Sequence, residues 1–236
     1  MATENFTWGA PRIHGELLML GYDVSERTVS RFLRKRPADP EAQQRWRTFL
    51  CSHREVLAAM DFFTVPTATF RVLYVFFVIH HARRTVLHVR VTEHPTASWI
   101  TQQLREAFPY DAVPRYLIFD HDKKYGDVVL AVIAHMGIRR KQITPHSPWQ
   151  NGVAERWVET VRRDLLDHVI VLDERHLQRL LSALIACYHD DRTHLGLAKG
   201  TPSLRKDAAK PIGDTEVVAL PRVGGLHHRY EWREAA

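Results

Sequence analysis

Residues 56–92 read VLAAMDFFTVPTATFRVLYVFFVIHHARRTVLHVRVT and carry the first signal of a β-sheet. Three apolar stretches, 56–65, 70–80 and 85–92, are separated by short turn-forming segments. Short runs of β-branched and aromatic residues joined by tight turns are typical of β-hairpins. We therefore expect three consecutive antiparallel strands.

Helical and strand-like patterns alternate downstream of these strands. A helix is expected over 95–108, where Trp99, Ile100, Leu104 and Phe108 share one face. Strands are expected over 115–119 and 138–143, and further helices over 128–136, 151–168 and 174–188. Three strands followed by alternating helices and strands predict an α/β fold, with a mixed five-stranded sheet flanked by helices.

The composition indicates a globular protein with a basic surface. The 236 residues include 33 Lys and Arg against 27 Asp and Glu, a formal net charge of +6, which favours a polyanionic partner. Two cysteines exclude a disulfide framework and a four-cysteine zinc site. The first 20 residues do not form a signal peptide, and the most apolar run, 72–79, is too short to span a bilayer. We expect a soluble protein of a reducing, intracellular compartment with no membrane partner.

Residues 1–55 are predicted to form a small helical segment ahead of the sheet. Apolar residues recur at helical spacing from Ile13 up to Gly21, and Ser25 is placed to cap a second helix. Two helices joined by a glycine turn, the second with a basic end, are typical of a helix-turn-helix segment. An ordinary solvated helical hairpin fits the same pattern. Prolines over 36–40 then predict a linker.

Asp61 is an acidic residue in the middle of an apolar strand. Burial of a lone carboxylate is costly unless a cation or strong hydrogen-bond donors meet it. Strand alternation places Asp61 on the same face as Ala59 and Phe63. A solvated sheet edge, or an arginine partner, is the structural alternative.

Asp120 directly follows the short apolar strand over 115–119. Open α/β sheets place their ligands at the C-terminal ends of strands, so this position is suited to a functional acid. Asp122 lies two residues further on and competes for the role. A turn or helix cap is the structural alternative, and it fits Asp122 better than Asp120.

Glu155 lies early in the helix expected over 151–168. At about 100° per residue, it falls at the rim of the apolar face that includes Trp157 and Val161. A long acidic side chain at this rim can reach a site at the edge of the sheet. The alternative is a surface glutamate paired with Arg162.

Three acids that converge with no lysine beside them would form a site of hard oxygen ligands suited to Mg²⁺. Two such ions about 3.5–4 Å apart activate a hydroxyl nucleophile and stabilise the leaving oxygen of a phosphodiester displacement. Asp61, Asp120 and Glu155 are therefore the predicted catalytic residues and metal ligands. Two Mg²⁺ ions are the expected cofactor, with Mn²⁺ as a substitute.

Three blocks of sequence resemble the integrase/transposase superfamily with an RNase H-like core and a D,D,E triad, most of all the insertion-sequence transposases related to retroviral integrases. The blocks are MDFF around Asp61, YLIFDHDKKYG around Asp120, and TPHSPWQNGVAERWVETVRRDLLDHVI around Glu155. Asp120 and Glu155 are 35 positions apart (155 − 120), close to the family's second spacing. Retroviral relatives carry Asp-Asn-Gly at the second acid, whereas this chain has His121 and Asp122 after Asp120.

The resemblance implies a Mg²⁺-dependent DNA transposase or integrase that cleaves DNA ends and transfers strands during DNA integration and recombination. It implies an RNase H-like core over 56–208, between the helical segment over 1–55 and a C-terminal tail over 209–236. It further implies double-stranded DNA partners, both element ends and target, a homo-oligomer on DNA, and a bacterial-type cytoplasmic location at the nucleoid.

Several residues near the third block are candidate DNA contacts. Basic side chains are predicted to bind phosphates, and the loop over 145–152 offers stacking and hydrogen-bonding groups. The predicted contacts are Arg139, Arg140, Lys141, Trp149, Gln150, Asn151, Arg156, Arg162 and Arg163. The alternative is that these charges form an ordinary solvated surface and that Trp149 packs beneath the loop.

Two other functions remain open on sequence grounds. A plain RNase H-like nuclease would hydrolyse DNA without joining it. A catalytically silent DNA-binding remnant of a truncated transposase is the other alternative, since such enzymes normally carry more DNA-binding helices before Asn5.

Overall fold

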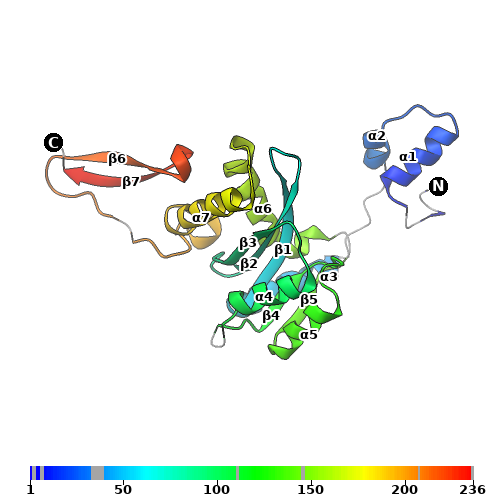
Figure 1. Cartoon of the computed structure of the whole chain (residues 1–236), viewed down its shortest axis with the longest axis horizontal. Coiled ribbons are helices and arrows are strands. Elements are labelled where there is room, and N and C mark those ends of the chain that lie inside the picture. Colours follow the sequence, from blue (N-terminus) through cyan, green and yellow to red (C-terminus); the bar gives the residue numbers. More distant parts are fainter. Residues whose placement is uncertain are drawn as a thin grey trace. The chain divides into compact units, whose positions relative to one another are not determined.

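The computed structural model describes residues 1, 4–5, 8–32, 40–109, 112–144, 147–206 and 208–234. The chain divides into two compact units, Met1–Phe49 and Leu50–Ala236. The larger unit contains the sheet (Figure 1). The linker predicted over 36–40 lies almost entirely outside the described residues.

The N-terminal unit is helical, with α1 (Ala10–Met19), α2 (Glu26–Phe32) and most of α3 (Pro40–His53). After α1 the chain turns at Gly21, whose φ of 84° is a conformation that favours glycine. Ser25 caps α2 as predicted, because its hydroxyl accepts a hydrogen bond from the backbone N–H of Thr28 at 3.2 Å. α3 was not predicted from the sequence, because its residues are mostly polar.

The larger unit is built on a mixed five-stranded sheet. Its strands are β1 (Leu57–Pro66), β2 (Val72–His80), β3 (Val86–Thr92), β4 (Tyr116–Phe119) and β5 (Arg139–Gln142). Their order is β3-β2-β1-β4-β5. The first three strands pair antiparallel, β4 is parallel to β1, and β5 is parallel to β4. The predicted sheet is confirmed.

Helices cover both faces of this sheet (Figure 1). On one face, α4 (Ala97–Ala107) and α5 (Asp127–His135) share a buried core with β1, β2 and β4. On the other face, α6 (Gly152–Asp164) contacts β1 and α7 (Glu174–Asp190) contacts β3. α6 ends four residues earlier than predicted (168 − 164), and the short 3₁₀ helix η3 (Leu166–His168) follows it. None of the helices in the described ranges is long and apolar enough to cross a membrane.

A β-hairpin follows α7 in the C-terminal part of the chain. Its strands are β6 (Thr215–Arg222) and β7 (His227–Glu234). The sequence analysis expected only a tail, because Pro221 and the turn glycines interrupt the strand pattern. Asp191, just after α7, pairs with Arg222 at 2.9 Å and with Arg229 at 3.4 Å. These ion pairs attach the hairpin to the end of α7.

Candidate active site

The register between β1 and β4 brings Asp61 and Asp120 to the same level of the sheet. Parallel pairing aligns Ala59 with Ile118, an offset of 59 positions (118 − 59). The same offset, continued two residues further, aligns Asp61 with Asp120. Neighbouring strands lie about 4.8 Å apart, and both aspartates line the same cleft as Glu155 and Val158 of α6. The 59 positions that separate Asp61 from Asp120 in the sequence therefore equal the offset between paired residues of β1 and β4.

Glu155 joins the two aspartates from the first turn of α6. A cleft of about 410 Å³ is lined by Asp61, Asp120 and Glu155, together with Lys124 and Arg162. The structure thus brings the three predicted acids to one cleft, although they come from two strands and a helix.

Asp61 is the most perturbed of these acids. Burial is the main reason why the pKa of Asp61 is raised to about 7; the negative charges of Asp120, Glu155 and Asp122 contribute to the rise, and a backbone hydrogen bond opposes it. That bond is donated by the N–H of Phe62 at 2.7 Å. Within the described residues, Asp61, Asp120 and Glu155 form no ion pair, so the arginine partners proposed as the structural alternative for Asp61 and Glu155 are not found there.

Asp122 has a different role from Asp120. Its backbone N–H donates to Asp120 Oδ1 at 3.0 Å, and its own carboxylate accepts from the backbone N–H of Lys124 at 2.9 Å and from Lys124 Nζ at 2.6 Å. Asp122 is therefore a turn cap, as its structural alternative predicted. The expectation that no lysine lies beside the acids is wrong, because the turn after β4 brings Lys124 into the cleft.

The residues of the cleft fit a divalent cation by their chemistry. The three acids offer only oxygen ligands, which Mg²⁺ prefers. Their mutual repulsion contributes to the raised pKa of Asp61, and a bound cation would relieve that repulsion. In the part of the chain that the structure describes, no group of three His, Cys, Asp or Glu side chains is already arranged to hold a metal ion. The acids therefore line an open cleft and do not form a closed metal cage.

The basic residues predicted on β5 lie at the edge of the sheet. Arg139 and Arg140 are exposed. Lys141 is half-buried, and its Nζ lies 5.7 Å from the ring centroid of Tyr116. Arg139 and Arg140 are therefore accessible to solvent on the edge strand β5, next to β4.

The loop before α6 is only partly open to solvent. Trp149 is 38% exposed, whereas Asn151 is 3% exposed, and among the residues that the structure describes neither polar atom of its amide has a hydrogen-bond partner. Gln150 Oε1 accepts from the backbone N–H of Thr144 at 2.6 Å, which closes the loop. In this arrangement Trp149 faces solvent and Asn151 faces the interior. Pro145 and His146 lie outside the described residues.

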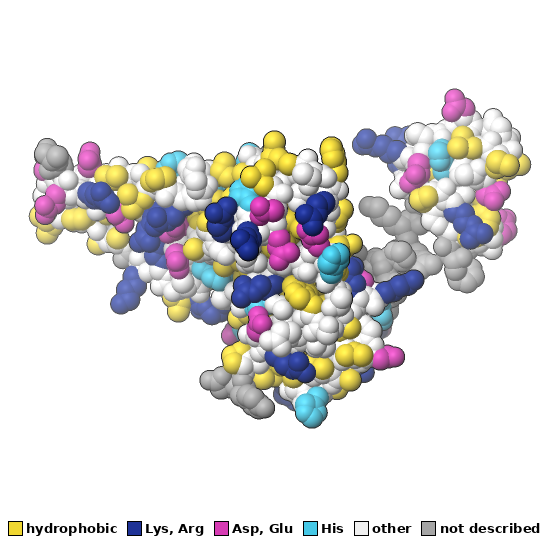
Figure 2. All heavy atoms as spheres, in the orientation of Figure 1, with side chains coloured by type: hydrophobic (Ala, Val, Ile, Leu, Met, Phe, Trp, Pro, Cys, Tyr) yellow, Lys and Arg dark blue, Asp and Glu magenta, His cyan; other side chains and the backbone are white. Residues whose placement is uncertain are grey.

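The three arginines predicted on α6 differ in their surroundings. Arg162 lines the carboxylate cleft. Arg156 is exposed and lies 3.9 Å from Glu159, and Arg163 pairs with Asp164 at 2.9 Å. Of the nine predicted DNA contacts, Arg162 alone lies in the cleft. Figure 2 shows basic and acidic side chains interspersed over this part of the surface.

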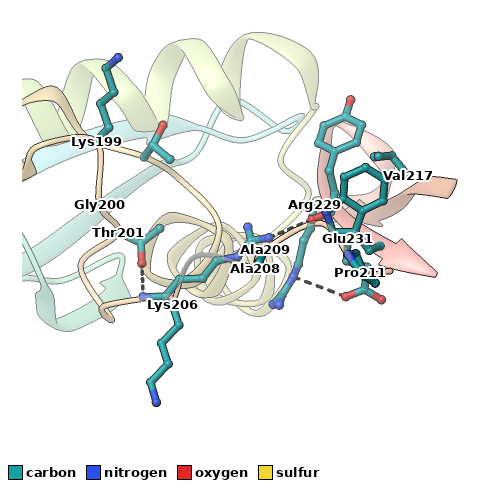
Figure 3. Close-up of a pocket in the computed structure, with 14 residues that line it drawn as sticks. Lys199, Gly200, Thr201, Lys206, Ala208, Ala209, Pro211, Val217, Arg229 and Glu231 are labelled. Carbon is teal, nitrogen blue, oxygen red and sulfur yellow. Dashed lines mark hydrogen bonds and ion pairs between the residues drawn. The ribbon is translucent and has the colours of Figure 1, made fainter. Parts of the chain in front are cut away.

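A second, larger cavity was missed by the sequence analysis. It has a volume of about 920 Å³ and lies between residues 199–211 and the β6–β7 hairpin (Figure 3). Its basic and aromatic lining residues are Lys199, Arg205, Lys206, Arg229, Tyr230 and Trp232. Lys199 and Lys206 extend in opposite directions (Figure 3), and Arg205 donates to the carbonyl of Tyr230 at 2.9 Å. We name this cavity the hairpin groove; the missed hairpin is the reason why the sequence did not reveal it.

The fold defines a class of protein. A mixed five-stranded sheet in the order β3-β2-β1-β4-β5, flanked by helices, is the arrangement of an RNase H-like, integrase-type core. Residues 136–202 match the family model described as integrase core domain. This segment includes Glu155 and all of α6.

A solved structure has a similar fold. A chain in the cryoEM structure of the simian T-cell lymphotropic virus intasome in complex with PP2A regulatory subunit B56 gamma has a TM-score of 0.53 and 16% identity. That match covers 76% of this chain and 66% of the other, just under two thirds. The catalytic core domain of BIV integrase has a TM-score of 0.45 and 18% identity, over 63% of this chain and 91% of that one. No curated protein matches the chain. The protein therefore has an integrase-like catalytic core fold.

Proposed function

We propose that this protein is a divalent-metal-dependent polynucleotidyl transferase that cleaves DNA ends and joins them to a target. The observation that carries this proposal is the shared cleft of Asp61, Asp120 and Glu155, whose carboxylates have no ion-pair partner among the described residues. Unpaired acids in one cleft are unfavourable for the free protein. A metal-dependent function explains why the three acids lie together, because a bound cation would neutralise their charges.

The cleft residues have distinct tasks in this proposal. Asp61 and Asp120 would hold Mg²⁺ from the sheet, and Glu155 would hold it from α6 and help to orient the nucleophile. Bound Mg²⁺ supplies Lewis-acid activation of water for cleavage or of a 3′-hydroxyl for joining. Because the pKa of Asp61 is raised to about 7, Asp61 must lose its proton before it can act as a ligand at neutral pH.

Basic surfaces near the cleft are suited to the phosphates of double-stranded DNA. Arg162 lies in the cleft, and Arg139 and Arg140 are exposed on the edge strand. Contacts of this kind give salt-dependent and largely sequence-independent affinity. The hairpin groove provides a second basic surface. Joining involves an element end and a target, for which a homo-oligomer on DNA is the expected working form.

The test is a joining assay that distinguishes the three candidate functions. A labelled duplex with a recessed 3′ end is incubated with supercoiled plasmid and protein in Mg²⁺ or Mn²⁺. We expect label to appear on the plasmid with the wild-type protein and not with Glu155→Gln, a change that keeps the size of the side chain and removes its charge.

The other outcomes each contradict the proposal in a different way. Shortened label without joined plasmid would indicate a nuclease. DNA binding with no cleavage or joining in Mn²⁺ would indicate a DNA-binding remnant. Joining by Glu155→Gln in Mg²⁺ would remove Glu155 from the catalytic set.

A further inference from the structure

Lys124 occupies a fixed position in the wall of the carboxylate cleft. Its side chain is 29% exposed, and its Nζ lies 2.6 Å from Asp122 Oδ2. The same Nζ lies 5.6 Å from the ring centroid of Phe62 and 5.4 Å from that of Tyr74. Asp122 also accepts from the backbone N–H of Lys124 at 2.9 Å. Side chains from β1, β2 and the turn after β4 thus hold this ammonium in place.

The partner of Lys124 is unexpected for a lysine in this cleft. Asp61, Asp120 and Glu155 line the same cleft, and opposite charges in a partly buried site attract strongly. Within the described residues, the ammonium nevertheless pairs with Asp122 and with none of these three acids. Asp122 therefore keeps a nearby cation from neutralising the acids that the proposed function requires.

We propose that Lys124 binds a phosphate oxygen of the nucleic acid in the cleft, and that Asp122 is a positioning residue that holds the Lys124 ammonium apart from Asp61, Asp120 and Glu155. An ammonium group has three N–H donors, so donors remain for an anionic oxygen after Asp122 has taken one. Lysine binds phosphate as a compact point charge. This inference rests on the proposed function and adds to it a residue that contacts substrate.

The first experiment measures duplex DNA binding in EDTA at several salt concentrations. Lys123 is an exposed lysine next to Lys124 and does not line the cleft, so Lys123→Gln is the matched control. We expect Lys124→Gln to reduce the slope of log affinity against log salt by about 0.9, the loss of one phosphate contact. Lys124→Arg keeps the charge and should keep the slope, whereas Lys123→Gln should leave it unchanged.

The second experiment measures Mn²⁺ binding without DNA and tests the role of Asp122. Asp122→Asn keeps an oxygen that can accept from the N–H of Lys124 but removes the charge that holds the ammonium. The released ammonium then competes for the three acids, so we expect Mn²⁺ affinity to fall about tenfold, the scale of a lost supporting contact. The double variant Asp122→Asn/Lys124→Gln removes the competitor and should bind Mn²⁺ within about twofold of wild type.

Each part of the inference has a result that would overturn it. An unchanged salt slope for Lys124→Gln, or an equal loss for Lys123→Gln, would exclude a specific phosphate contact. Unchanged Mn²⁺ affinity in Asp122→Asn, or no recovery in the double variant, would exclude the positioning role. DNA binding in EDTA needs neither metal nor turnover. If no joined product forms but Lys124→Gln still reduces the salt slope, the result counts against the proposed function alone.

Discussion

Two groups of acidic residues lie on the same side of the sheet and differ in their partners. In the carboxylate cleft, Asp61, Asp120 and Glu155 form no ion pair among the described residues. Asp164, the last residue of α6, pairs with Arg163 and Arg192, and Asp191, just after α7, pairs with Arg222 and Arg229.

The difference shows how the same side-chain type serves two purposes. Asp191 is only 5% exposed, and its arginines compensate for the loss of water. Asp61 is also largely buried, but its neighbours are other acids, which raise its pKa further. Paired acids stabilise the free fold, whereas the unpaired acids carry a cost that a bound cation would remove.

The largest expected effect is on catalysis. We expect Asp120→Asn to reduce joined product by about 10³-fold or more, since it removes a metal ligand, while DNA affinity stays within a few-fold. Asp164→Asn, in the paired group, should keep activity within a few-fold at a temperature where it is folded. Equal losses of joined product in Asp120→Asn and Asp164→Asn would show that the unpaired acids are no more important for catalysis than the paired ones.

The next effect concerns the dependence of stability on pH. The folded protein binds the Asp61 proton up to about pH 7, whereas the unfolded chain releases it near pH 4. Stability is therefore lost as pH rises between these values. We expect Asp61→Asn to raise the free energy of unfolding at pH 8 by about 2–4 kcal/mol and to have little effect at pH 4. Urea denaturation at both pH values measures this, and a less stable variant at pH 8 would contradict it.

The paired group should respond in the opposite direction. Asp164→Ala leaves Arg192 half-buried without its carboxylate, so we expect a loss of about 1–3 kcal/mol in the free energy of unfolding at pH 8. Arg163 is 59% exposed and contributes little to this loss. Urea denaturation at pH 8 measures this loss, with Arg163→Ala as the control. A gain in stability for Asp164→Ala would contradict the view that the paired acids stabilise the fold and the unpaired acids do not.

The smallest effect is expected in the hairpin groove. Replacing Lys199 and Lys206 together by Gln should lower the salt slope of DNA binding by about 1–2 and reduce affinity several-fold. Both residues are exposed, and their side chains extend in opposite directions (Figure 3), so stability should not change. Fluorescence anisotropy with a labelled duplex measures the slope, and an unchanged slope would remove the groove from the DNA-binding surface.

The sequence predicted the core of this protein well because its strands and helices have strong apolar periodicity. The β1–β3 strands and the helices α4 to α7 were all expected. Three acids were singled out because each interrupts or adjoins an apolar pattern. Their shared cleft then depends on the β1–β4 register, which no local pattern reveals.

The remaining features depend on contacts between distant or weakly patterned segments. α3 is mostly polar, and the hairpin contains Pro221 and a glycine turn, so neither has a clear period. Lys124 was not singled out from the sequence, because only the turn held by Asp122 directs it into the cleft. Asn151 was predicted to contact DNA, but the closed loop buries its side chain.

A titration of Mn²⁺ into metal-free protein at pH 8, where Asp61 is ionised, most directly tests whether the unpaired acids form a cation site. We expect saturable binding to the wild type, and a loss of affinity of about 100-fold in Asp61→Asn and Asp120→Asn, since each loses a ligand charge. Asp164→Asn should bind like the wild type. Undetectable binding to the wild type, or equal binding by Asp120→Asn, would contradict the account.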